Sequence, residues 1–267
     1  RQIGALNTKD YELYLTNQDG TPMSFFHDVP LHPGGDENIF NMVVEIPKGN
    51  NAKLEIQKEI PLNPIKQKVK DSGKLKFISN LEGTTGYIGN YGSIPQTWED
   101  PHKGSAAAHT SGGDNDPVDV VDISEIGGYP GEIKQVKLLG GLLMVDDGTT
   151  DWKLIALNVN DPHANQVNDI ADLDKAWPDR LDKVKSWLKN YKVPQSGEQN
   201  TFAYDGQCKD SAFVKNMIKD SHDYWQNLVD GKTDPDDIQI INLTVEGSKN
   251  LTDANGQACK AVKPAKP

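Results

Sequence analysis

The chain of 267 residues carries 39 Asp and Glu residues against 28 Lys and Arg residues, which gives a formal net charge of −11. That length suffices for a full hydrophobic core, in one large domain or two small ones. An acidic chain without a stripe of basic residues is a poor binder of nucleic acids and membrane surfaces. No apolar run reaches the ~18 residues of a membrane span. We therefore expect a soluble globular protein that binds neither nucleic acid nor membrane.

Short strand-like segments fill the first two-thirds of the chain, separated by Gly, Pro, Asn and Asp. Several alternate apolar and polar residues, as half-buried strands do. In the sequence KLEI, for example, Lys53 and Glu55 share one face and the two apolar residues share the other. The segments with this character are residues 11–16, 40–46, 52–59, 74–78, 118–123, 132–139, 142–145 and 152–158.

The last third of the chain has the apolar spacing of helices. The three expected helices cover residues 168–174, 178–193 and 211–229. Proline near its first turn favours the start of the second helix, Pro194 stops it, and Gly231 ends the third. Beyond them, residues 237–245 resemble a strand and residues 260–267 a loose tail. Strands followed by helices predict an α+β, mainly β domain, in which a barrel or curled sheet carries helices at its edge.

The two cysteines, Cys208 and Cys259, are far apart and lack the spacing of a metal site. Two free thiols and a single disulfide both remain open at this point, and a disulfide would imply an oxidising compartment. Glycosylation sequons at Asn242 and Asn250 are a weak indication of secretion. A cytoplasmic protein is slightly favoured, with secretion as the alternative.

The stretch GDNDPVDVVD places four carboxylates close together in the sequence. In an extended backbone Asp114 and Asp116 point the same way. Pro117 keeps Asp116 extended and allows a bend that returns Asp119 to the first two. Three converging oxygen ligands suit a hard divalent cation such as Mg²⁺, Mn²⁺ or Ca²⁺.

Three other structures could carry this stretch, and the first two need features that the chain lacks. An EF-hand would need a Gly where Asp119 stands, and helices on both sides. An aspartyl-phosphate hydrolase would need a buried strand before the motif, where this chain has AAAHTSGG. A solvated acidic turn remains as favourable as a metal site on the motif alone.

Further polar residues occur at the ends of other predicted strands and in loops. The segment VDDGTTDWK offers Asp146, Asp147 and Asp151 at a hairpin tip, followed by Lys153. Lysines and tyrosines recur in KLEI, GYIGNYG and NYKVP. Carboxylates hold metal ions, whereas ammonium groups and tyrosine hydroxyls bind phosphate oxygens. The whole set predicts a polyanionic phosphate substrate presented with several divalent ions.

The segments MVVEIP, NAKLEI, GYIGNYG, PQTWEDP, GDNDPVDV, TDWK and NYKVP resemble, in this order, the family I soluble inorganic pyrophosphatases of eukaryotic type. The resemblance extends from residue 1 to about residue 229, and residues 234–267 form a divergent tail. It implies a single domain over residues 1–267, with an OB-like five-stranded β-barrel, flanking helices and extra strands. It also implies Mg²⁺-dependent hydrolysis of pyrophosphate to two orthophosphates.

The resemblance also assigns roles to residues, and Asp116 would be the general base that activates the attacking water. Three to four Mg²⁺ ions would be bound with substrate, and Mn²⁺ suits the same oxygen ligands. The implied metal ligands are Asp114, Asp119, Asp151, Asp146 and Glu55. The implied substrate ligands are Lys53, Lys76, Tyr91, Lys153, Tyr191 and Lys192. Four more residues would line the site, namely Glu45, Tyr87, Glu99 and Asp147.

Two departures from the family pattern stand out. Lys76 replaces an arginine, which keeps the positive charge but loses the bidentate fork. Lys48 and Gly49 replace the Arg-Trp pair of the family's dimer interface, so a monomer or an altered dimer is an alternative to the implied homodimer.

A cation-binding protein and a phosphohydrolase for larger substrates are the competing functions. The phosphate-binding residues argue against the first of these.

Overall fold

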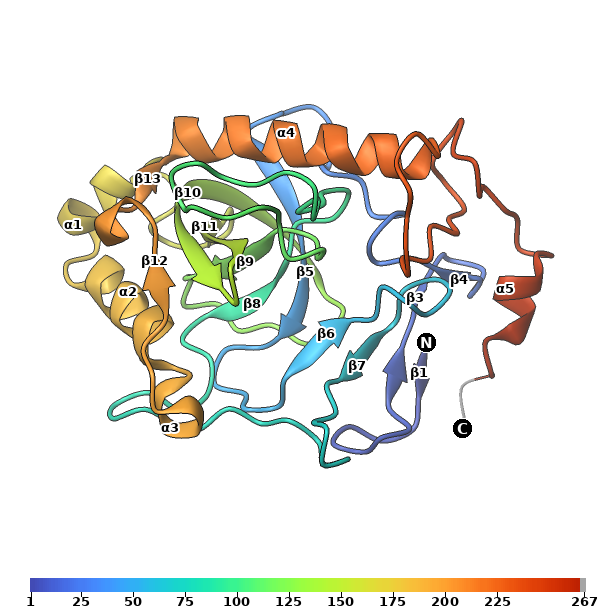
Figure 1. Cartoon of the computed structure of the whole chain (residues 1–267), viewed down its shortest axis with the longest axis horizontal. Helices are drawn as coiled ribbons and strands as arrows, with labels where there is room; N and C mark the ends of the chain where they lie inside the picture. Colours follow the sequence, from blue (N-terminus) through green and yellow to red (C-terminus); the bar gives the residue numbers. More distant parts are fainter. Residues whose placement is uncertain (265–267) are drawn as a thin grey trace.

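Five strands form a closed ring in the computed structural model of the protein, which describes residues 1–264 (Figure 1). Around the ring the order is β11, β9, β8, β5 and β10, and β10 pairs again with β11. Strands β9 and β11 are parallel, and the other neighbours are antiparallel. Their bounds are β5 Ile39–Ile46, β8 Asn90–Ser93, β9 Asp119–Asp122, β10 Ile133–Asp146 and β11 Thr149–Asn158. The ring confirms the predicted OB-like, five-stranded architecture.

Eight shorter strands extend this framework. A four-stranded sheet in the order β1-β2-β7-β6 lies to the right of and below the ring in Figure 1. Strands β3 and β4 pair with each other, and β12 and β13 add to β10. The bounds are β1 Gln2–Ile3, β2 Glu12–Leu13, β3 Leu15–Thr16, β4 Pro22–Met23, β6 Leu54–Ile56, β7 Ile65–Gln67, β12 Thr201–Phe202 and β13 Lys209–Asp210.

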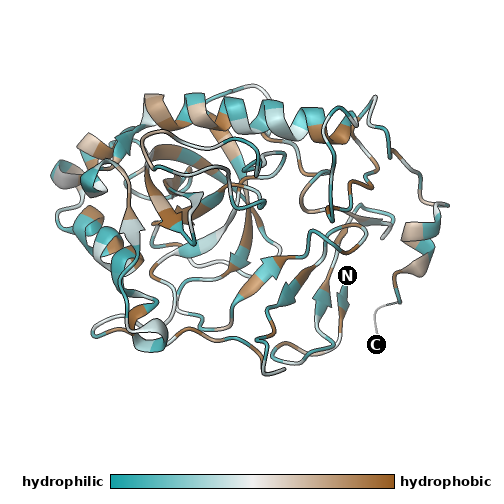
Figure 2. Cartoon of the chain, viewed as in Figure 1, coloured by the Kyte–Doolittle hydropathy of each residue, from teal (hydrophilic) through white to brown (hydrophobic). Residues whose placement is uncertain are grey.

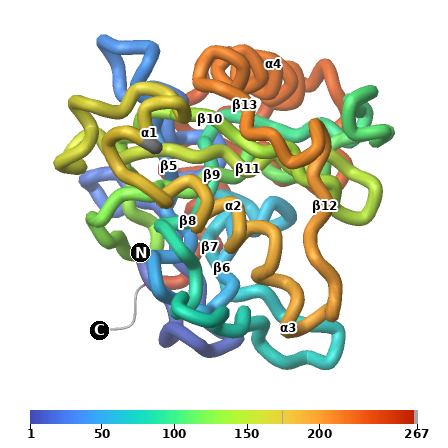
Figure 3. The backbone as a smooth tube through the Cα atoms, turned by 90° about the vertical axis from the view of Figure 1, so that its left-hand side faces the viewer, coloured from blue at the N-terminus to red at the C-terminus, as the bar shows by residue number. Residues whose placement is uncertain are grey.

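Helix α2 lies beside the ring, and helix α4 (Ser211–Val229) lies across its top (Figures 1 and 3). Helix α4 has the predicted bounds because Asp210 caps its first turn, accepting from Phe213 N at 2.8 Å, and Gly231 follows its end with φ +70°. The other helices are α1 Ile170–Ala176, α2 Arg180–Asn190, α3 Val193–Ser196, the 3₁₀ turn Tyr204–Gly206 and α5 Gln257–Ala261.

The alternation of the ring strands separates two sets of buried side chains. On one face, Met42 and Leu154 pack in the same apolar cluster as Val214 and Ile218 of α4. On the other face, Ile155 belongs to a larger cluster that includes aromatic residues of α2 and the loops. Figure 2 shows hydrophobic residues concentrated on the ring strands and recurring along α4. The face of the ring strands that packs against α4 is therefore entirely apolar in this cluster. Polar side chains of the same strands lie on the opposite face.

Several predicted boundaries were wrong. Strand β10 runs unbroken past the predicted division, with a bulge between Leu138 and Gly140. Residues 74–78 form only isolated bridges, such as the one joining Ala52 and Phe77. Pro194 does not stop α2, which ends earlier; it lies in the first turn of α3, where no amide hydrogen is needed. Strand β8 was not predicted, although it joins β9 to β5 in the ring.

Residues 237–245 were predicted as a strand and form none. Two of their amides are bound by a side chain: the buried Asp28 carboxylate accepts from Leu243 N at 2.7 Å and from Thr244 N at 2.9 Å. The end of the chain is less loose than predicted, since α5 buries Cys259 against Ile3. The last three residues of the predicted tail, 265–267, lie outside the described residues.

Both thiols are free in the structure. Cys208 is half-buried, whereas Cys259 is the buried residue of α5. Within residues 1–264, no helix is both long enough and apolar enough to cross a bilayer.

The buried imidazole of His27 joins the N-terminal region to α4 and to the C-terminal segment. Trp225 Nε1 donates to His27 Nδ1 at 2.9 Å, and His27 Nε2 lies 3.1 Å from the carbonyl oxygen of Gln239. These partners require a neutral ring that carries its proton on Nε2. Burial lowers the pKa of His27 to about 4.

We expect His27 to make the fold less stable in acid. Below about pH 6.5 the unfolded chain binds a proton at this residue, whereas the folded chain stays neutral until about pH 4. The free energy of unfolding should therefore fall by about 2 kcal/mol between pH 7 and pH 5 from this residue. Urea unfolding of wild type and His27→Gln at both pH values measures the difference. Equal losses in the two proteins would contradict the assignment.

Candidate active site

The register of three neighbouring strands places polar side chains on one face of the ring. Lys153 of β11 pairs with Asp119 of β9, and Asp119 pairs with Ser93 of β8. Directly paired residues share a face, and so do residues two apart in one strand. Asp151 and Tyr91 therefore join the same surface. Polar residues predicted on separate strands meet here because of the strand pairing.

A fourth strand reaches this surface through a close contact between backbones. Strand β5 has an irregularity between Val44 and Ile46, where it crosses Gly92 of β8. A Cβ on Gly92 would lie 1.9 Å from the carbonyl oxygen of Val43, so only glycine permits this approach. Glu45, at the irregularity, is buried, and its Oε1 accepts from Ile56 N at 2.9 Å. Burial, reinforced by the charge of Asp119, raises the pKa of Glu45 to about 8.

The acidic loop, residues 113–118, is held to the segment PQTWEDP by backbone hydrogen bonds. Glu99 N donates to Asp116 O at 2.9 Å, and Asn115 N donates to Glu99 O at 3.0 Å. A Cβ on Gly113 would lie 2.4 Å from Glu99 O, so glycine is needed for this pairing. The pairing brings the Glu99 side chain next to Asp114.

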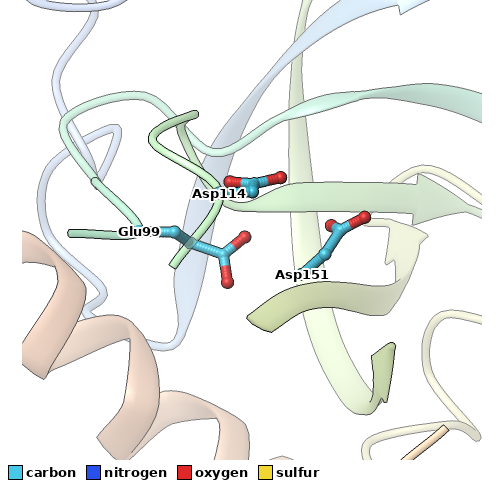
Figure 4. A group of neighbouring side chains, drawn as sticks. All are labelled: Glu99, Asp114 and Asp151. Carbon is cyan, nitrogen blue, oxygen red and sulfur yellow. The ribbon is translucent and has the colours of Figure 1, made fainter. Parts of the chain in front are cut away.

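Three carboxylates converge at this point, as Figure 4 shows. Oxygen atoms of Glu99, Asp114 and Asp151 all lie within 4.8 Å of one another. Burial and mutual repulsion raise the pKa of Glu99 and of Asp114 well above their usual range. Burial also raises the pKa of Asp151 to about 6, although Lys153 opposes the shift. A set of crowded oxygen donors that resists carrying its charges alone suits a divalent cation.

Lys153 lies between two of the predicted metal ligands. Its Nζ donates to Asp151 Oδ1 at 2.6 Å, to Tyr91 OH at 3.0 Å and to Asp119 Oδ2. Tyr91 OH also donates to Asp119 Oδ2 at 2.5 Å. Burial alone would lower the pKa of Lys153, but the two aspartates raise it well above its usual range. Lys153 thus stays charged inside the site.

Aromatic rings and lysines form the adjoining wall. Tyr87 packs on Tyr91 with ring centroids 5.0 Å apart, and Tyr191 stacks on Trp187 at 4.7 Å. Lys53 Nζ lies 5.5 Å from the centre of the Tyr91 ring. Burial raises the pKa of each of these tyrosines, so their hydroxyls remain hydrogen-bond donors.

The remaining predicted site residues are at the margins of this surface. Lys192 Nζ bonds Asp146 Oδ2 at 2.5 Å. Glu55 Oε2 lies 3.7 Å from Lys53 Nζ, and Glu55 Oε1 lies 3.4 Å from Lys68 Nζ. Burial, together with the nearby charge of Lys53, lowers the pKa of Lys76. Asp147 is exposed in the turn between β10 and β11, with a φ of +48°.

Several polar residues that line the cavity at this surface, about 410 Å³ in volume, were not predicted, among them Lys58, Ser93 and Gln67. Lys58 Nζ bonds Asp116 Oδ1 at 2.7 Å. Ser93 Oγ and Gln67 Oε1 are buried, and neither has a hydrogen-bond partner among residues 1–264. No local sequence signal distinguishes these residues. Unpaired buried polar atoms fit a cavity whose contents are hydrated ions or phosphate oxygens.

Comparison with known proteins agrees with this geometry. The sequence profile described as "Inorganic pyrophosphatase" matches residues 42–226. The chain is 46% identical over 265 residues to an inorganic pyrophosphatase of Candida glabrata, covering 99% of this chain and 91% of that protein. It is 45% identical to an inorganic pyrophosphatase of Schizosaccharomyces pombe, covering 93% and 85%.

Solved structures extend the comparison to the fold. The inorganic pyrophosphatase of Schistosoma japonicum superposes with a TM-score of 0.87 at 38% identity, covering 97% of this chain and 98% of that one. A truncated vacuolar soluble pyrophosphatase of Trypanosoma cruzi, solved in complex with PPi, gives 0.77 at 37% identity, covering 85% and 89%. By sequence and by fold, the chain belongs to the inorganic pyrophosphatase family.

Proposed function

We propose that this chain hydrolyses inorganic pyrophosphate to two orthophosphates in an Mg²⁺-dependent reaction. The observation that carries the proposal is the buried cluster of Glu99, Asp114 and Asp151, placed directly beside the ammonium group of Lys153 and the hydroxyl of Tyr91. A pure cation-binding protein would have no use for buried phosphate-binding groups at its metal site. A site for phosphate esters and anhydrides needs both kinds of residue.

The donor set fits hard divalent cations. Asp114, Asp119 and Asp151 would hold one Mg²⁺, and Asp146 and Glu55 would contribute to others, up to three or four with substrate. Glu99, which the sequence placed only in the lining, belongs to the same cluster by its position. When bound, Mg²⁺ lowers the pKa of a coordinated water and neutralises phosphate charge. Mn²⁺ suits the same oxygen ligands.

The protein's own groups would orient the substrate and accept a proton. Asp116 is half exposed at the cavity, where its carboxylate takes the proton of the attacking water. The positively charged and hydroxyl groups along the wall hold the two phosphates and offset the charge that develops on the leaving one. These groups are Lys53, Lys76, Tyr91, Lys153, Tyr191 and Lys192.

The homodimer implied by the family resemblance stays a prediction. Lys48 and Gly49 are both exposed, so an interface at this place would lack the aromatic anchor that tryptophan supplies. A monomer or an altered dimer is compatible with this surface.

Phosphate release from pyrophosphate and from ATP, each with Mg²⁺ and with EDTA, tests the proposed reaction. We expect rapid release from pyrophosphate with Mg²⁺ and none with EDTA, because the carboxylates of the site repel a polyanion unless cations intervene. Comparable release from ATP would indicate a broader phosphohydrolase. No Mg²⁺-dependent release from pyrophosphate would overturn the proposal.

Replacing Asp116 by Asn should separate catalysis from metal binding. We expect kcat to fall by about 10²- to 10⁴-fold, because the amide cannot accept the proton. Mg²⁺ affinity by calorimetry should change little, since Asp116 lies outside the carboxylate cluster. Asp223→Asn, an exposed position on α4, is the matched control. Wild-type turnover in Asp116→Asn would remove the assigned role.

Replacing Glu99 by Gln tests the carboxylate cluster. The amide oxygen can still accept from Trp152 N, which bonds Glu99 Oε1 at 3.1 Å, but the negative charge is lost. We expect the tightest Mg²⁺ binding to weaken by about 10- to 100-fold, measured by calorimetry on the folded protein. The exposed Glu246→Gln serves as control. Unchanged Mg²⁺ affinity would place Glu99 outside the metal site.

A further inference from the structure

Lys58 contacts the acidic loop at the residue proposed as the general base. It follows β6, and its side chain is only 18% exposed. Its ammonium group donates to Asp116 Oδ1 at 2.7 Å and to the carbonyl oxygen of Asn115 at 2.9 Å. Neither the family resemblance nor the motif spacing assigns Lys58 a role.

The backbone of Lys58 is anchored deep in the protein. Its carbonyl oxygen accepts from Gln239 N at 2.8 Å and from Asn63 Nδ2 at 3.1 Å. Gln239 in turn bonds the buried ring of His27 through its own carbonyl oxygen. This network joins three distant parts of the chain, so the ammonium group extends from a fixed point.

The backbone of the acidic loop is also fixed, but the side chain of Asp116 is not. Trp98 Nε1 donates to Asn115 Oδ1 at 2.9 Å, and Asp116 N donates to Asp114 Oδ1 at 3.0 Å. The Asp116 carboxylate is 53% exposed. Among residues 1–264, Lys58 is the one hydrogen-bond partner of this carboxylate. The direction in which the carboxylate points therefore depends on Lys58.

We propose that Lys58 is a positioning residue for Asp116, a role that rests on the proposed pyrophosphate hydrolysis. Lys58 holds Oδ1, which leaves Oδ2 as the oxygen that accepts the proton of the attacking water. The resulting hydroxide forms the new bond to phosphorus as the bridging P–O bond breaks. A base held at one oxygen keeps the other in line with the water, and misplacement by about 1 Å costs on the order of 10²-fold in rate.

Two other roles for Lys58 make different predictions. If its ammonium group bound substrate phosphate, its loss would raise KM and would do so whether or not Asp116 is present. If it only stabilised the loop, its loss would lower thermal stability and Mg²⁺ affinity with turnover per folded molecule unchanged. A positioning role lowers kcat and needs Asp116.

A double-mutant cycle tests the proposal with kcat, KM and Mg²⁺ affinity measured for each protein. Lys58→Met keeps most of the length of the side chain and removes the charge. We expect kcat to fall by about 10²-fold with KM and calorimetric Mg²⁺ binding nearly unchanged. In the Asp116→Asn background, which retains a measurable rate, the same change should have little further effect, because coupled residues are non-additive.

Two more variants complete the design. Lys58→Arg keeps a cation within reach of Asp116 and should recover most of the lost turnover. Lys232→Met is the matched control, since the ammonium group of Lys232 also donates to an aspartate, Asp230, at 2.8 Å, but Lys232 does not line this cavity. It should leave the kinetics unchanged.

The outcomes separate this proposal from the proposed function. An equal loss of kcat in both backgrounds, or a rise in KM alone, would overturn the positioning role while leaving pyrophosphate hydrolysis in place. A wild-type protein that releases no phosphate from pyrophosphate with Mg²⁺ would overturn the proposed function, and the role of Lys58 with it.

Discussion

Repulsion between buried carboxylates is the constraint on which the rest of this structure depends. Glu99, Asp114 and Asp151 crowd within 4.8 Å of one another, where burial already disfavours their charged forms. Lys153, inserted between Asp119 and Asp151, offsets part of that repulsion within the protein. Buried like charges of this kind have a large free-energy cost. Binding of cations together with a polyanion would offset that cost. The site is therefore an unfavourable charge distribution that its ligands make favourable.

The fold supplies the rigidity that this arrangement requires. The five-stranded ring commits one face to apolar packing against α4, through residues such as Leu154 and Ile218. The opposite face of the same strands can then carry charged groups at positions set by the ladder register. Strand pairing fixes the backbone positions of Asp119, Asp151 and Lys153, and backbone hydrogen bonds between the loops fix those of Glu99 and Asp114. Electrostatic preorganisation of this kind is the main source of catalysis in phosphoryl transfer.

The C-terminal segment connects the site to the rest of the chain. Asp28 binds the amides of Leu243 and Thr244, and Gln239 joins His27 to Lys58. Through Lys58 this network reaches Asp116. Residues 234–267, which the family resemblance left as a divergent tail, thus have a structural path to the proposed base. The amides of Leu243 and Thr244 are taken up by the Asp28 side chain and that of Gln239 by the Lys58 carbonyl oxygen, so within residues 1–264 no neighbouring strand pairs with this strand-like pattern.

The sequence by itself determined the elements whose signals are local. The apolar spacing of Ser211–Val229 predicts α4, and the apolar residues that flank Asp119 and Lys153 predict the strands β9 and β11. The spacing of Asp114, Asp116 and Asp119 by itself left a cation site and a solvated acidic turn equally favourable. Only the tertiary structure joined Glu99 to that cluster and Lys58 to Asp116. Those contacts arise from strand register and backbone pairing between distant segments, and no short stretch of sequence encodes where another stretch will lie.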